Sequence, residues 1–129
     1  MSLFASPNAA AVDSIIVVAN TQDKTINLTR QEVRNLFMGG ALRYELTAVA
    51  LPANNQTRVI FNTKVVGLTE SRIQSYWAQM RFSGRKKAPK EINNEALVIE
   101  YLKNNQGSVA YLPADAEIPE HLTVLFKIR

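Results

Sequence analysis

The residues best suited to chemistry lie in the run PANNQTR, residues 52 to 58. An apolar segment, Leu46 to Leu51, precedes this run, and a helical pattern follows it. A strand, a loop and a helix start in that order suit an anion, because the first backbone N–H groups of a helix are unpaired and its dipole is positive there. The predicted oxyanion site consists of five residues, Asn54, Asn55, Gln56, Thr57 and Arg58. The alternative is ordinary capping by asparagine, with Arg58 on the surface.

A second charged cluster lies between residues 81 and 90, interrupted by Gly84 and Pro89. Its five basic residues are Arg81, Arg85, Lys86, Lys87 and Lys90. The cluster predicts either a solvated loop or a partner surface for phosphate, nucleic acid or an acidic protein. Only Trp77 and Phe82 lie close by, which is too few aromatic residues for a typical nucleic-acid surface. We therefore expect no nucleic-acid partner.

The residue types that most enzymes and metal sites need are scarce in this chain. It has no cysteine and one histidine, His121, which precedes the last predicted strand. No carboxylates recur at ligand spacing, and neither phosphate-binding glycine motif is present. We expect a non-enzymatic protein without a metal or cofactor, in which His121 lies on the surface.

Composition indicates one globular domain. The chain has 129 residues, of which 47% are hydrophobic and 20% charged, with a formal net charge of +4. No apolar run reaches the roughly 18 residues that a membrane-spanning helix needs, so we expect no transmembrane segment. Ala9 and Ala11 have the A-x-A spacing of a secretory cleavage site, which predicts export to the periplasm. We expect residues 1–11 to be a disordered tail left from such a signal, and residues 12–129 to be a single domain; the alternative is a plain N-terminal tail.

Hydrophobic patterns and capping residues predict the elements that position these clusters. Strands are expected at 14–20, 46–51, 108–112 and 122–128. Thr29 and Glu32 form a capping box for a first helix that ends at Gly39. Three further helices are expected, the first of them from Asn54 or Asn55 to about Val66. The next follows Thr69 and places Ile73, Trp77 and Met80 in the core. The last follows Asn93 or Asn94, and its apolar side consists of Leu97, Val98, Tyr101 and Leu102. The order predicts an α/β or α+β sandwich around a small mixed sheet.

Several of these segments, in this order, resemble the phosphate-type substrate-binding proteins of ABC transporters, in the type 2 periplasmic binding protein superfamily. The matching segments are IIVVAN, LTRQEVRNLFMGG, TAVALPANNQTRVIF, the pair Tyr76-Trp77, RFSGRKKAP and NNQGSVAYLP. The resemblance implies an α/β fold with a small mixed sheet flanked by about four helices. It covers one of the two lobes that such proteins close on a ligand, so we expect an open half-cleft with poor affinity for a free anion.

The resemblance also places Asn55, Gln56 and Thr57 where the family usually has a Ser-Gly-Thr phosphate loop. Loss of the glycine weakens anion binding, because glycine lets the backbone approach an oxyanion closely. Two hypotheses follow. The domain binds phosphate or another small oxyanion weakly, or it is an interaction or sensory module. In the second case its half-cleft and basic cluster contact a membrane transporter, a sensor protein or a second copy of the chain.

Overall fold

The computed structural model describes residues 14–129, so the predicted tail at 1–11 lies outside the described part. A five-stranded mixed sheet forms its centre, in the order β3-β2-β4-β1-β5. β1 (Ile15–Ala19) pairs antiparallel with β4 (Ser108–Pro113) and with β5 (Thr123–Ile128). β2 (Thr47–Ala50) pairs parallel with β4 and with β3 (Lys90–Glu91). The predicted α/β fold with a small mixed sheet and four α-helices is confirmed.

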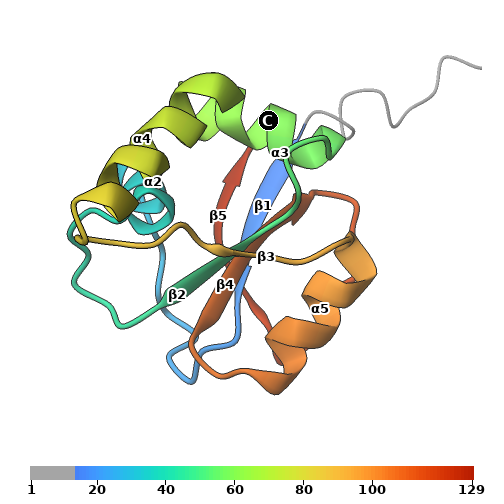
Figure 1. The fold of residues 1–129 in the computed structure, drawn as a ribbon. Helices are drawn as coiled ribbons and strands as arrows, with labels where there is room; N and C mark the ends of the chain where they lie inside the picture. Colours follow the sequence, from blue (N-terminus) through green and yellow to red (C-terminus); the bar gives the residue numbers. More distant parts are fainter. Residues whose placement is uncertain (1–13) are drawn as a thin grey trace, which may run out of the picture.

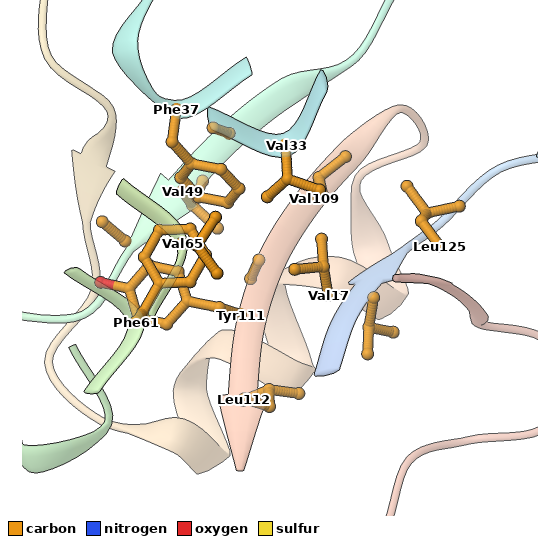
Figure 2. Packing of buried hydrophobic residues seen from close by; sticks show 14 of the residues in the cluster. Val17, Val33, Phe37, Val49, Phe61, Val65, Val109, Tyr111, Leu112 and Leu125 are labelled. Carbon is orange, nitrogen blue, oxygen red and sulfur yellow. The ribbon is translucent and has the colours of Figure 1, made fainter. Parts of the chain in front are cut away.

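Helices cover both faces of this sheet. α2 (Arg30–Met38), α3 (Gln56–Phe61) and α4 (Glu70–Phe82) lie on one side, and α5 (Glu95–Asn104) lies on the other (Figure 1). Alternate residues of a strand face opposite sides, so the central strand β4 supplies core residues to both layers. Tyr111 stacks on Phe61 with ring centroids 4.1 Å apart, and Phe37 lies 5.5 Å from the same Tyr111 ring (Figure 2). The neighbouring Leu112 is fully buried on the opposite face.

The capping residues act as the sequence predicts. The Thr29 side chain accepts a hydrogen bond from the Glu32 N–H, and the Glu32 carboxylate accepts one from the Thr29 N–H. Thr69 and Asn94 cap α4 and α5 with one bond each, because their side chains accept from the N–H groups of Arg72 and Leu97. Gly39 ends α2 with a φ of 78°, a left-handed conformation that favours glycine.

Three details differ from the predicted elements. The second helix reaches Val66 as expected, but its last turn is a π-helix, η1 (Asn62–Val66), which turns the Asn62 amide toward Glu70. The short edge strand β3 was predicted as loop, because two charged residues carry no hydrophobic period. Val98 and Leu102 fill the core side of α5 as predicted, but Leu97, also predicted to face the core, is 48% exposed.

Candidate functional site

The predicted site lies where β2 ends and α3 begins, at the edge of the sheet. Asn55 is the N-cap, and its Oδ1 accepts a hydrogen bond from the Arg58 N–H at 3.2 Å. Asn54 and Gln56 are exposed at this edge, whereas Thr57 is buried. The structure thus brings Asn54, Asn55, Gln56 and Thr57 together in one helix start.

A carboxylate of the protein already meets this helix start. The Thr57 hydroxyl donates to Glu95 Oε2 at 3.0 Å, from the first turn of α5. Helix starts favour negative charge, so a glutamate placed near two of them is stabilised there. Any free oxyanion that approaches Thr57 must therefore compete with, or be repelled by, Glu95.

Arg58 is turned away from the edge and into the fold. Its guanidinium donates from Nε to Glu70 Oε1 at 2.9 Å and from Nη2 to Glu70 Oε2 at 2.6 Å. Nη1 donates to the Leu51 carbonyl at 2.8 Å and to Glu91 Oε2 at 3.1 Å. The residue is only 7% exposed. One arginine therefore joins the end of β2, α4 and β3.

The charges of this cluster reinforce one another. Burial acts to lower the Arg58 pKa, but the hydrogen bonds and charge of Glu70 outweigh it, so the Arg58 pKa is raised. Burial acts to raise the Glu70 pKa, but hydrogen bonds from Arg58, Gln74 and Asn62 outweigh it and lower that pKa. Both groups are therefore charged at neutral pH. The positive charge of Arg58 is already matched by the carboxylates of Glu70 and Glu91.

A cavity beside Arg58 is small. Its volume is about 60 Å³, and Arg58, Glu91, Trp77 and Tyr111 contribute to its lining. Ligand pockets typically have roughly 300–1,000 Å³, so this cavity has room for a few water molecules only. The buried Tyr111 hydroxyl accepts a hydrogen bond from the Leu51 N–H at 3.0 Å, and burial raises its pKa to about 12.

The basic cluster occupies a different part of the surface. Arg81, Arg85, Lys86 and Lys87 are exposed around the C-terminal end of α4. Lys90 lies in β3, where its Nζ is 5.0 Å from the centre of the Tyr101 ring. The C-terminal end of α4 lies apart from the start of α3 (Figure 1), although Ala88 and Pro89 of the following loop line the same small cavity as Arg58. The structure does not join the two predicted clusters into one site.

The described residues offer little to catalysis or metal binding. His121 is exposed, as predicted, and its carbonyl accepts a hydrogen bond from Lys24. Residues 14–129 contain no group of three or more His, Cys, Asp or Glu side chains that could hold a metal ion. Within the same range, no helix is long and apolar enough to cross a membrane.

Glu70, Glu91 and Glu95 are not among the site residues that the sequence predicts. Two of them follow capping residues, Thr69 and Asn94, so a first-turn acidic position was visible in the sequence. Their pairing with Arg58 and Thr57 was not visible, because it depends on how α4, β3 and α5 pack against α3. The carboxylates therefore appear as partners only in the folded chain.

Comparison with solved structures identifies the fold. The structure is similar to an ABC-type phosphate transport receptor from Vibrio cholerae, with a TM-score of 0.63 and 16% identity over 88% of this chain and 46% of the receptor. It is also similar to PstS from Borrelia burgdorferi, with a TM-score of 0.61 and 12% identity over 88% and 46% of the two chains. The chain spans about half the length of these proteins, and its fold matches one lobe of a periplasmic binding protein. No protein-family model matches the sequence, and no curated protein matches it either.

Proposed function

We propose that this chain is an exported, non-enzymatic binding domain of the solute-binding-protein kind. Its working surface is the edge formed by Asn54, Asn55, Gln56 and Thr57, with Glu95 beside it. The similarity in fold to binding proteins supports this proposal, and so does the position of the edge at the ends of parallel strands, where α/β proteins commonly bind. The A-x-A spacing and the same similarity support the proposed export.

The edge functions as a contact surface that another protein covers. One observation carries this proposal: the strongest anion-binding group, Arg58, is buried and bound to Glu70, Glu91 and Leu51. What remains is an open, polar edge without a ligand-sized cavity beside Arg58. The polar groups of such an edge bind a partner more tightly when the partner's surface excludes water from them. A second copy of the chain is the simplest partner to test.

The absence of cysteine from the sequence makes the test simple. Ala53→Cys places a unique thiol at the exposed edge, and Ala78→Cys places a control thiol on the exposed face of α4. The rate of thiol labelling is measured from micromolar to near-millimolar protein, together with sedimentation equilibrium. We expect self-association that slows labelling of Cys at position 53 only. A monomer at all concentrations, or equal protection at position 78, would refute self-association through this edge.

Weak oxyanion binding is the second candidate. It is favoured by the Gln56 and Thr57 N–H groups, which have no acceptor within residues 14–129. In this mode Asn54 and Asn55 add polar contacts, and Arg58 contributes only through its distant charge. Titration calorimetry with phosphate and with sulfate tests it, using Thr57→Val to remove the hydroxyl. Saturable heat that Thr57→Val abolishes would support this candidate over the covered edge.

A further inference from the structure

The basic cluster of residues 81–90 contains the most exposed large apolar side chain of the described structure. Phe82, the last residue of α4, is 96% exposed. The other exposed large hydrophobic residues, Val59, Leu97 and Val124, are only 43% to 48% exposed. A single exposed apolar side chain is common on protein surfaces, so the exposure of Phe82 gains meaning only from the cations that flank it in the chain.

Phe82 is held outward by a rigid helix end. The Ser83 N–H donates to the Gln79 carbonyl at 3.0 Å, and the Arg85 N–H donates to the Met80 carbonyl at 3.0 Å. Gly84 has a φ of 72°, which reverses the chain after the helix. These bonds hold the backbone of the last turn, so Phe82 leaves the helix at a defined position.

The charge around Phe82 has one sign. Residues 71–90 contain six Lys and Arg and no Asp or Glu, whereas the whole chain has a net charge of only +4. Arg81, Arg85, Lys86 and Lys87 are exposed, and none of them forms an ion pair within residues 14–129. The rest of the chain is therefore net acidic, and this end of α4 is a concentrated positive pole.

The far side of the loop is anchored to the domain. A Cβ added at Gly39 would lie 2.9 Å from Lys86 Cδ and 3.2 Å from the Trp77 ring, so the Lys86 stem packs closely there. Ala88 and Pro89 line the cavity that also borders Trp77. The loop thus has an inner side that packs on the core and an outer side of free cations with one apolar ring.

We propose that this outer side docks on a membrane surface containing anionic lipids, with Phe82 inserted at the level of the headgroups. An apolar side chain within a cluster of Lys and Arg is what interfacial binding needs, because apolar burial adds to attraction by the lipid charge. Single-stranded nucleic acid fits less well. It stacks successive bases on several aromatic rings, whereas Trp77 is buried here and the Tyr76 hydroxyl donates to the Met38 carbonyl.

Co-sedimentation of the full chain with vesicles tests this proposal. The vesicles are of phosphatidylcholine alone or of phosphatidylcholine with phosphatidylglycerol. We expect binding only to the anionic vesicles, reduced by salt. Lys86→Gln/Lys87→Gln should lower the partition coefficient on the order of 25-fold, at about fivefold per basic residue. Phe82→Ser should lower it several-fold, with an unchanged melting temperature because the ring packs on nothing.

Matched controls keep the test specific. Lys127→Gln/Arg129→Gln removes two exposed charges at the other end of the chain, and Leu97→Ser removes a half-exposed apolar side chain from α5. Both controls should bind as the unmodified chain does. Equal binding to neutral vesicles, no loss with Phe82→Ser, or an equal loss in the controls would overturn the proposal. Tighter binding of a single-stranded oligonucleotide than of anionic vesicles would also overturn it, and would assign the cluster to nucleic acid.

Discussion

Arg58 on α3 and Glu70 on α4 form a two-pronged ion pair, with Nε–Oε1 and Nη2–Oε2 distances of 2.9 and 2.6 Å. The Arg58 side chain is 8% exposed and that of Glu70 is 30% exposed. The planar fork of arginine matches a carboxylate in this geometry, and lysine does not. The pair therefore fixes α4 against the start of α3. It also holds Arg58, which the sequence predicts to bind an oxyanion, away from the exposed edge.

Removal of the guanidinium should destabilise the domain. We expect Arg58→Ala to lower the free energy of unfolding by about 2–4 kcal/mol, because it leaves the Leu51 carbonyl without this donor and Glu70 without its cation. Partial exposure of Glu70 keeps the loss below that of a fully buried pair. Urea unfolding measures it. The control is Arg72→Ala, an exposed residue on the same helix as Glu70, which should change the free energy by less than about 0.5 kcal/mol. Equal effects of the two variants would contradict a structural role for Arg58.

Acid should weaken the same pair. The Glu70 pKa is lowered below its ordinary value of 4.5, so the native state binds a proton at this group less readily than the unfolded state does. Its contribution is present above pH 4.5 and is lost as the pH falls through the lower native pKa. We expect the acid-induced decline in unfolding free energy to be shallower in Glu70→Gln, measured by urea unfolding from about pH 7 to about pH 3. A decline of the same slope in both proteins would show that other carboxylates account for it.

The stability of the domain at alkaline pH should depend on Tyr111. Its pKa is raised from 10.0 to about 12 by burial, so the neutral phenol is favoured in the native state. The resulting stability is present below pH 10.0 and is lost as the pH rises toward 12. Tyr111→Phe should remove this pH dependence. It should also cost about 1–3 kcal/mol at neutral pH, because the buried Leu51 N–H loses its acceptor. Thermal unfolding across the alkaline range distinguishes the two effects.

Two glycines allow strain to be separated from crowding. Gly39 and Gly84 have nearly equal φ values, 78° and 72°, but only Gly39 has neighbours close to the position of an added Cβ. We expect Gly84→Ala to cost about 1 kcal/mol for the left-handed conformation alone. Gly39→Ala should cost about 1–3 kcal/mol more, because Lys86 and Trp77 must move. Equal losses in free energy of unfolding would show that Lys86 yields freely and that the loop is not anchored at Gly39.

Local signals in the sequence predicted most of the elements but not the chemistry of the site. The Thr29–Glu32 capping box and the Gly39 stop are short-range patterns, so they located α2 correctly. β3 was missed because Lys90 and Glu91 owe their strand conformation to pairing with β2, a long-range contact. Arg58 was assigned to the surface edge because its position in the first turn was visible, whereas its partners on α4 and β3 were not.

Titration calorimetry of the full chain with phosphate tests the central claim most directly. With Arg58 held by Glu70, Glu91 and the Leu51 carbonyl, free phosphate should give no saturable heat below about millimolar concentration, a binding free energy weaker than about −4 kcal/mol. Arg58→Lys should leave that result unchanged while lowering stability. Micromolar binding of phosphate that Arg58→Lys abolishes would contradict the account. It would show that Arg58 leaves its carboxylates to bind the ligand.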